Sequence, residues 1–340
     1  MSEQFRIALE EYPMEWIVKL CGAQDKHLEL LRNAFSCDII MRDNELRILS
    51  EDAVTFHSIE SVVKALFNMM EAHIDVSGRD IEYACRLAKL NRLQELSTTY
   101  QKAIGKTVNG KLIYPKTIGQ RHLFKCMCNS EIVFATGVAG TGKTYLAVVY
   151  AADLLKKGEI RKIILTRPAV EAGENLGFLP GDLQSKIDPY LRPLYDALYQ
   201  IMGAESYLHN SEKGLIEVAP LAYMRGRTLD NAFIILDEAQ NTTPAQMKMF
   251  LTRIGFGSKV IVTGDQSQKD LPAGAASGLD TAIHVLKKID DIGFCYLTSS
   301  DVVRHPLVQK IVKAYDDYEA RMIKRKRSPR LNKRPDKGNR

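Results

Sequence analysis

The chain has 340 residues, of which 45% are hydrophobic and 26% are charged. This length suits about two globular domains, and the composition excludes a collagen-like or wholly disordered chain. No apolar run approaches the ~18 residues of a membrane-spanning helix, and the acidic N-terminus lacks a signal-peptide core, so we expect no membrane contact and a cytoplasmic location.

The net charge of +6 is concentrated at the C-terminus. Residues 321–340 contain ten Lys or Arg and one Asp, whereas the rest of the chain has 37 basic and 40 acidic residues. We therefore predict a near-neutral folded body and a basic disordered tail at 321–340. The tail is either a solubility device or a nonspecific contact with RNA phosphates.

Six cysteines are scattered along the chain. Cys126 and Cys128 are two residues apart, which is not the C-x-x-C spacing of a zinc knuckle or redox pair, and no second pair follows. We predict buried free thiols.

The first domain, at 1–76, is predicted to have the element order β-α-α-β-β-α. That order resembles a type-I KH domain, which clamps single-stranded nucleic acid with a GXXG loop between its first two helices. Residues 22–25 read GAQD, so the second glycine is absent. The module serves either RNA binding or subunit contact. The predicted strands are 5–11, 37–42 and 45–50, and the predicted helices are 14–21, 26–35 and 52–72.

A polar, helical stretch rich in Arg, Lys, Glu and Gln follows, and we predict that 77–111 connects two domains. Asn109-Gly110 predicts a small hairpin within 108–114.

A second domain at 112–320 is predicted from recurring apolar runs with helical segments between them. Several runs are continuous rather than alternating, as in strands buried on both faces. The pattern predicts a parallel sheet flanked by helices, the P-loop α/β class. The runs are 132–136, 162–166, 215–218, 232–236, 259–263 and 293–297.

The stretch GVAGTGKT at 137–144 matches G-x-x-x-x-G-K-[ST] in full, between a strand-like run and a helical segment. Its glycines let backbone N–H groups point at one phosphate, with a helix N-terminus behind them. Lys143 can reach the β- and γ-phosphates, and Thr144 can hold Mg²⁺. The alternative, a chance glycine-rich turn, is disfavoured by the flanking pattern. The predicted ATP- or GTP-binding residues are Gly137, Val138, Ala139, Gly140, Thr141, Gly142, Lys143, Thr144 and Tyr145.

Two further strands end in polar residues that suit the same site. Asp237 and Glu238 follow the run at 233–236, in the Walker B arrangement. Asp237 would hold Mg²⁺ through water, and Glu238 would orient and polarise the attacking water. After the run at 259–263, Gln268 or Asp265 could sense the γ-phosphate. An Asx-type turn is the alternative there.

Two isolated residues are weaker candidates. Gln120 lies about twenty residues before the P-loop, and its amide can both donate to and accept from an adenine edge. Arg304 could act as an arginine finger on the γ-phosphate.

Together GVAGTGKT, LTRPAV, DEAQ, GDQSQ and VVRHPLV resemble the first motor domain of superfamily-one helicases. The longer strings at 165–198 and 237–268 resemble the PhoH family of ATPases, and the likeness covers 112–320. The resemblance implies a RecA-like sheet, ATP and Mg²⁺ as ligands, and a link to RNA metabolism and phosphate starvation.

The resemblance also implies individual roles. Gln120 would select ATP over GTP, and Gln268 would sense the γ-phosphate. Arg304 matches the helicase arginine on that phosphate, and Arg167 lies where helicases contact the nucleic-acid strand. Lys143, Glu238, Gln268 and Arg304 would be the catalytic residues.

Superfamily-one helicases close their ATP site with a second motor domain, and only the basic tail follows residue 320 here. We therefore expect a ring, a homohexamer, in which a neighbour closes the site. The candidates for an arginine supplied by the neighbour are Arg167, Arg192, Arg225, Arg227 and Arg304.

The sequence leaves three functions open. The first is an RNA-coupled ATPase, with helicase or remodelling activity. The second is an ATP-switched adaptor that recruits a protein partner, such as a ribosome-maturation nuclease. The third, a small-molecule kinase, is disfavoured because no acceptor lid is visible in the sequence.

Overall fold

A computed structural model describes residues 3–50, 52–72, 74–99, 102–168, 183–272 and 274–303, with five helical positions beyond these at 307, 308, 311, 314 and 318. Met1–Val302 form one compact unit and Val303–Arg340 a second. The predicted tail at 321–340 and Arg304 lie outside the described residues, as do 169–182 of the PhoH-like string.

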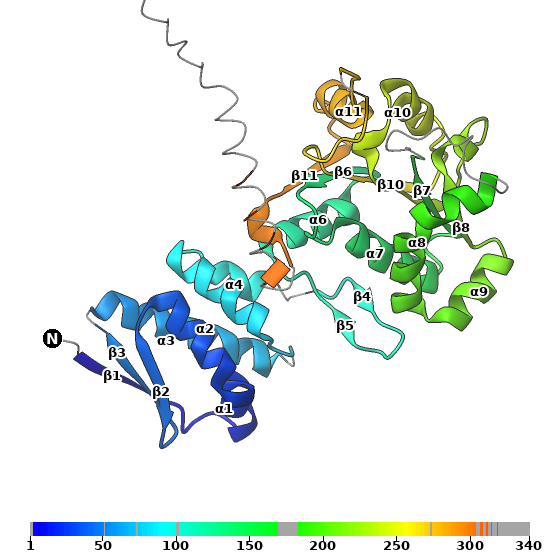
Figure 1. Cartoon of the computed structure of the whole chain (residues 1–340). Coiled ribbons are helices and arrows are strands. Elements are labelled where there is room, and N and C mark those ends of the chain that lie inside the picture. Colours follow the sequence, from blue (N-terminus) through cyan, green and yellow to red (C-terminus); the bar gives the residue numbers. More distant parts are fainter. Residues whose placement is uncertain are drawn as a thin grey trace, which may run out of the picture. The chain divides into compact units, whose positions relative to one another are not determined.

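The N-terminal region has the predicted element order β-α-α-β-β-α (Figure 1). Its antiparallel sheet has the order β1-β3-β2. Alternate strand residues such as Ile39, Leu46 and Ile48 are fully buried against the helices, as the two-residue period of a one-sided sheet requires. The elements are β1 (Glu3–Ala8), α1 (Met14–Cys21), α2 (Lys26–Phe35), β2 (Asp38–Arg42), β3 (Glu45–Ser50) and α3 (Ala53–Glu71).

The GAQD turn keeps a left-handed backbone at the position of the missing glycine. Asp25 has a φ of 57°, and Gly22 has a φ of 71°. Aspartate is one of the few residues that adopt this conformation without large cost, so the chain turns without the second glycine. The turn nevertheless carries a carboxylate where a KH loop approaches phosphate.

The predicted connection at 77–111 is wrong in its first part. Helix α4 (Gly78–Lys89) buries Ile81, Ala84 and Leu87 in the same core as the N-terminal sheet, and Leu96 of α5 (Gln94–Thr99) joins them. Charged residues on the outer face of α4 make its composition resemble that of a solvated linker. The apolar residues on its other face are buried in the core. The N-terminal domain therefore extends beyond 76, to at least Leu96.

The small hairpin is present, with strands β4 (Gly105–Lys106) and β5 (Leu112–Ile113). Gly110 has a φ of 78° in the turn between them, as the Asn-Gly pair predicts.

The second region is a six-stranded parallel sheet in the order β11-β6-β10-β9-β7-β8, so all six predicted strands are confirmed. This sheet with its flanking helices is a RecA-like P-loop α/β fold. Its strands are β6 (Ile132–Gly137), β7 (Lys162–Arg167), β8 (Ile216–Pro220), β9 (Ala232–Leu236), β10 (Lys259–Gly264) and β11 (Ile292–Leu297).

Helices cover both faces of this sheet (Figure 1). One core joins α6, α7 and α8 to side chains such as Val133 and Ile235, and the other joins α10 and α11 to side chains such as Phe134 and Ile234. Each fully buried Val, Ile or Phe contributes roughly 1.5–3 kcal/mol, which explains the continuous apolar runs. The helices are α6 (Ile118–Asn129), α7 (Lys143–Lys157), α8 (Leu183–Met202), α9 (Ala204–Glu212), α10 (Pro244–Leu251) and α11 (Gly278–Leu286).

The six cysteines are free thiols, as predicted, but only Cys85 and Cys295 are buried. Burial raises the pKa of each of these two thiols to about 12, so they stay protonated. The others are half-buried.

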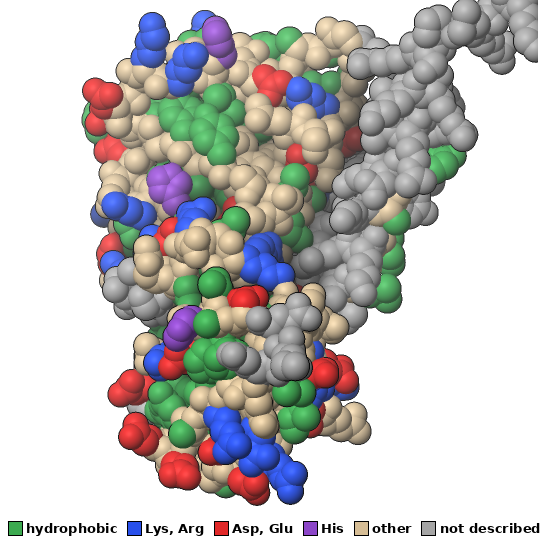
Figure 2. Space-filling view, turned by 90° about the vertical axis from the view of Figure 1, so that its left-hand side faces the viewer, with side chains coloured by type: hydrophobic (Ala, Val, Ile, Leu, Met, Phe, Trp, Pro, Cys, Tyr) green, Lys and Arg blue, Asp and Glu red, His purple; other side chains and the backbone are tan. Residues whose placement is uncertain are grey.

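Charges of both signs are interspersed on the face shown in Figure 2, as the near-neutral balance outside the tail predicts. Within the described parts of the chain, no helix combines the length and apolar character that crossing a membrane requires.

Candidate functional site: a phosphate-loop pocket

A pocket of about 240 Å³ opens at the carboxyl ends of the parallel strands. Strand β10 lies between β6 and β9, so the ends of these three strands lie side by side. Three predicted segments meet at this edge, which is where open α/β sheets bind ligands. The pocket is lined by Ala139, Gly140, Gly142, Lys143, Thr144, Tyr145, Asp237, Glu238, Gly264, Asp265 and Gln268.

The phosphate loop leaves β6 through Gly137, which has a φ of 145°. A Cβ at this position would overlap the carbonyl oxygen of Leu297 on the neighbouring strand β11. Gly142 has a φ of 82° where α7 begins. These positions require glycine, because the loop must turn sharply beside β11 and then enter the helix.

Lys143 folds back over the loop. Its Nζ donates to the carbonyl oxygens of Gly137 at 2.6 Å and Val138 at 3.0 Å, and to Thr141 Oγ1 at 3.3 Å. Three oxygens therefore hold the ammonium group at the centre of the loop. Phosphate oxygens are stronger partners for this group, so the lysine is placed to bind a phosphate that enters the loop.

A hydroxyl cluster lies beside the lysine. Asp237 Oδ1 accepts hydrogen bonds from Thr144 Oγ1 at 2.6 Å and from Thr263 Oγ1 at 2.7 Å. Asp237 is only 8% exposed. A carboxylate and two hydroxyls are hard oxygen donors of the kind that Mg²⁺ prefers, so these residues fit the metal that a P-loop site uses.

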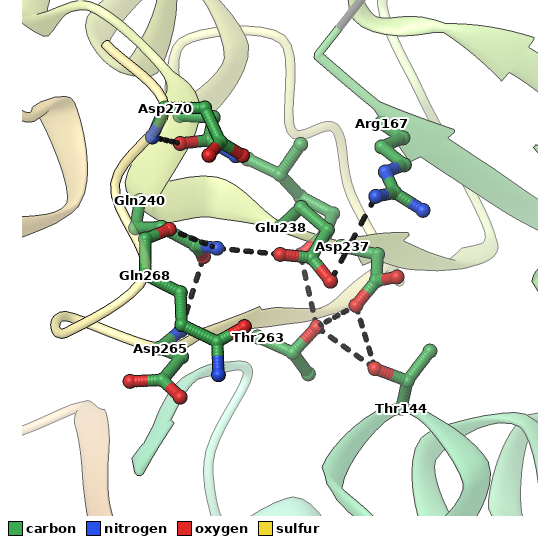
Figure 3. Close-up of polar contacts among 11 residues, drawn as sticks. Thr144, Arg167, Asp237, Glu238, Gln240, Thr263, Asp265, Gln268 and Asp270 are labelled. Carbon is green, nitrogen blue, oxygen red and sulfur yellow. Dashed lines mark hydrogen bonds and ion pairs between the residues drawn. The ribbon is translucent and has the colours of Figure 1, made fainter. Parts of the chain in front are cut away.

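Glu238 follows directly and has a left-handed backbone, with a φ of 52°. A non-glycine residue in this conformation is uncommon, and such strain is concentrated at functional sites. Its Oε1 lies 3.9 Å from Arg167 Nη2, and its Oε2 accepts a hydrogen bond from Gln240 Nε2. Figure 3 shows its carboxylate between these two side chains, beside Asp237.

Gln240 was not predicted as a site residue. Its side chain is buried, and it contacts Glu238, the backbone N–H of Asp265 and the carbonyl oxygen of Gln268. The signal was the fourth letter of DEAQ, which the sequence interpretation used only as part of a family motif. Thr263 was also missed, although it is the last residue of the predicted run at 259–263 in strand β10.

The segment after β10 contains both candidates for a γ-phosphate sensor. Both carboxylate oxygens of Asp265 already accept hydrogen bonds. Oδ2 accepts from Ala139 N at 3.0 Å, and Oδ1 accepts from the backbone N–H and the hydroxyl of Ser267. The bond to Ala139 holds this segment against the phosphate loop. Gln268 is exposed and lines the pocket, so it is the better placed of the two to contact a ligand.

Gln120 lies behind the phosphate loop and is 4% exposed. Its Oε1 accepts from Lys116 N at 2.7 Å, and its Nε2 donates to the carbonyl oxygen of Thr141 at 2.9 Å. In this structure the amide stabilises the phosphate loop. A contact with adenine would have to use the second lone pair of Oε1 and the second hydrogen of Nε2. Its adenine role stays a prediction.

Tyr145 lies at the wall of the pocket, half-buried. Burial raises the pKa of its phenol, so the side chain is neutral and offers an aromatic face and a hydroxyl. Arg304 lies outside the described residues, so its predicted role stays a prediction.

The region around the pocket matches a known family. Residues 112–316 match the PhoH family, described as "PhoH-like protein". A PhoH-like protein of Bacillus subtilis (strain 168) is 54% identical over 299 residues, which cover 88% of this chain and 93% of the relative. One of Synechocystis sp. is 48% identical over 306 residues, covering 90% and 93%.

A shorter match comes from the "Protein PhoH" of Escherichia coli (strain K12), which is 46% identical over 205 residues, covering 60% of this chain and 58% of the relative. The family model spans more than half of the chain, and the Bacillus subtilis relative matches along most of its length. The chain therefore belongs to the PhoH family of P-loop nucleoside triphosphatases.

Proposed function

We propose that this protein is a Mg²⁺-dependent ATPase whose turnover is coupled to RNA. The observation that carries the proposal is the convergence of Lys143, Thr144, Asp237 and Glu238 on one pocket at the carboxyl edge of the sheet. Membership in a P-loop family supports nucleotide binding.

Each of these residues has its own role in hydrolysis. The loop N–H groups and Lys143 bind the phosphates, and Glu238 orients a water and accepts its proton as the water oxygen attacks the γ-phosphorus. The bond to the bridging oxygen then breaks, and ADP and phosphate leave. Mg²⁺, held through Thr144 and Asp237, would neutralise the charge that develops on the phosphates. Gln268 is the proposed γ-phosphate sensor.

Coupling to RNA rests on three features of the chain. The motifs resemble a helicase motor domain, in which the position of Arg167 contacts the nucleic-acid strand. The N-terminal domain has the element order of a KH domain. Ten basic residues at 321–340 supply an electrostatic contact for phosphates. The carboxylate of Asp25 argues against the GAQD turn as the main RNA contact.

We extend the proposal to a homohexameric ring in which a neighbour completes the ATP site. Among the contacts that the structure describes, Arg167 lies 3.9 Å from Glu238, and Arg227 donates to Glu217 with both Nη1 and Nη2. Arg192 and Arg225 are exposed and are the better candidates among described residues. Light scattering after size exclusion that gave a monomer with and without ATP would exclude the ring.

The test of the main proposal is ATP hydrolysis by the full chain, with and without single-stranded RNA. Lys143→Ala is the blank, and Lys156→Ala, exposed on the same helix, is the matched control. We expect hydrolysis that RNA stimulates, lost in the blank and kept in the control. Hydrolysis that is indifferent to RNA would favour the ATP-switched adaptor, and the search would move to a protein partner such as a ribosome-maturation nuclease.

A further inference from the structure

The side-chain amide of Gln240 joins two parts of the site that act on the same phosphate. Its Nε2 donates to Glu238 Oε2 and to the carbonyl oxygen of Gln268, and its Oε1 accepts from Asp265 N at 3.0 Å. Figure 3 shows it between Glu238 and the segment that contains Asp265 and Gln268. One amide therefore contacts both the water-orienting carboxylate and the proposed γ-phosphate sensor.

The orientation of this amide follows from its partners. An N–H from Asp265 requires the oxygen on that side, while a carboxylate and a carbonyl require the NH₂ group on the other. Both hydrogens of Nε2 are used. The side chain is 1% exposed, so water does not compete for these bonds.

The surrounding backbone is built to admit the amide. A Cβ on Gly264 would lie 2.8 Å from Gln240 Oε1 and 2.6 Å from Leu279 Cδ2, so only glycine leaves room there. The turn that carries Gln240, η4 (Ala239–Asn241), also holds the segment through Asn241, which exchanges two hydrogen bonds with Asp270. Asn241 anchors the segment with its side chain, whereas the side chain of Gln240 contacts both the segment and the Glu238 carboxylate.

We propose that Gln240 is a positioning residue for hydrolysis, which sets the carboxylate of Glu238 according to the position of the 265–268 segment. When Gln268 moves toward a γ-phosphate, the carbonyl that Nε2 binds moves with it, and the same amide carries that displacement to Glu238. The inference rests on the proposed ATPase function and adds the residue that links sensing to water activation.

The deciding variant is Gln240→Glu, which keeps the size of the side chain and the acceptor for Asp265 N. It replaces the NH₂ group by an oxygen that faces the Glu238 carboxylate. The hydrogen bond to Glu238 is then lost, and repulsion between the two carboxylates moves Glu238 away from the position that the amide sets. We expect kcat to fall about 100-fold, the lower range for loss of general-base catalysis. Affinity for a non-hydrolysable ATP analogue should stay within about twofold, since the phosphate loop is untouched.

The matched control is Gln246→Glu, the same change on an exposed side chain of α10. Gln246 Oε1 accepts from Thr243 N at 2.8 Å in a capping box, a position that suits Glu equally well, so kcat should not change. If Gln240→Glu does not fold, Gln240→Met fills similar space without the three bonds and should lower kcat to the same degree.

A double variant separates positioning from a general structural role. Because Gln240 acts through Glu238, adding Gln240→Glu to Glu238→Gln should lower the residual single-turnover rate by less than about twofold. A second loss as large as the first would overturn the inference, as would a kcat in Gln240→Glu equal to that of the wild type. A wild type without turnover would overturn the proposed function and this inference with it, which is a distinguishable result.

Discussion

Thr144 Oγ1 donates a 2.6 Å hydrogen bond to Asp237 Oδ1. This bond joins the first turn of α7 to the end of β9, across strand β10. The two oxygens come from segments 93 residues apart in the sequence. Their meeting in the lining of the pocket is the geometric basis for the proposal that both hold one metal ion.

The first prediction is that Thr144→Val raises the Mg²⁺ concentration for half-maximal ATP hydrolysis by at least about tenfold, because one oxygen ligand is lost. Thr144→Ser keeps the hydroxyl and should restore wild-type behaviour. Thr252→Val is the control, since the exposed Thr252 hydroxyl donates to Met249 O and accepts from Arg253 Nη2 and does not line the pocket. Chelation of the metal should stop turnover in every variant. A wild-type metal titration in Thr144→Val would remove Thr144 from the metal site.

The second prediction is that Glu238→Gln keeps ATP bound but slows hydrolysis by about 100-fold or more, because an amide cannot accept the proton of the attacking water. Filter binding with labelled ATP and a single-turnover assay would measure the two effects separately. Glu212→Gln, exposed at the end of α9, is the control. Normal turnover in Glu238→Gln would move the catalytic role to another residue.

Much of this site could be predicted because its signals are local in sequence. The glycines and Lys143 occur at fixed spacing between a strand and a helix, and Asp237 and Glu238 follow an apolar run directly. The link from Gln240 to the 265–268 segment could not be predicted, because it depends on β10 lying beside β9. Strand order is a long-range property that no local pattern contains.

The fold shows the same division. The six parallel strands were predictable, since burial on both faces leaves continuous apolar runs. Helix α4 was assigned to a linker because the stretch that contains it is rich in Arg, Lys, Glu and Gln. Ile81 and Leu87 pack against a core formed by residues far earlier in the chain. The sequence of the helix alone does not show which domain its apolar face packs against.

The third prediction concerns Gly137 and the stability of the loop. Gly137→Ala places a Cβ onto the carbonyl oxygen of Leu297, at a φ that L-residues rarely adopt. Gly158→Ala, at the end of α7, has a φ of 73° but no atom within 4 Å of the added Cβ. The control should lower the free energy of unfolding by about 1 kcal/mol, the cost of a left-handed backbone for alanine. Gly137→Ala adds a steric clash and should lower it by more than about 3 kcal/mol. Denaturant unfolding that gave equal losses would show that the clash relaxes freely.

The fourth prediction is that a chain ending at residue 320 binds single-stranded RNA more weakly and with a flatter dependence on salt. Each phosphate contact contributes roughly 0.7 to the slope of log K against log salt for single strands, so loss of several basic residues should lower the slope by several units. A full-length chain with its Lys and Arg at 321–340 replaced by Gln should behave like the truncated one. Unchanged affinity and slope in both would leave the tail as a solubility device.

The fifth prediction follows from the ion pair between Arg227 and Glu217, whose two N–O distances are 2.6 and 2.7 Å. The hydrogen bonds from Arg227 hold the pKa of Glu217 below its ordinary value of 4.5. The folded state therefore binds this proton less tightly than the unfolded state does. The resulting stability is fully present above the ordinary pKa and is lost as pH falls through the lowered one.

A double-mutant cycle with Arg227→Gln and Glu217→Gln measures this pair apart from other titrating groups. Both side chains are about one-third exposed, so solvent screening limits the expected coupling energy to about 1 kcal/mol at neutral pH. The coupling should stay constant down to the ordinary glutamate pKa and then disappear in more acidic solution. A coupling that declines already above that pKa would mean that the folded state binds the Glu217 proton more tightly than the unfolded chain, which contradicts the bidentate geometry. A coupling of zero at neutral pH would instead return Arg227 to the candidates for the arginine that a neighbouring subunit supplies.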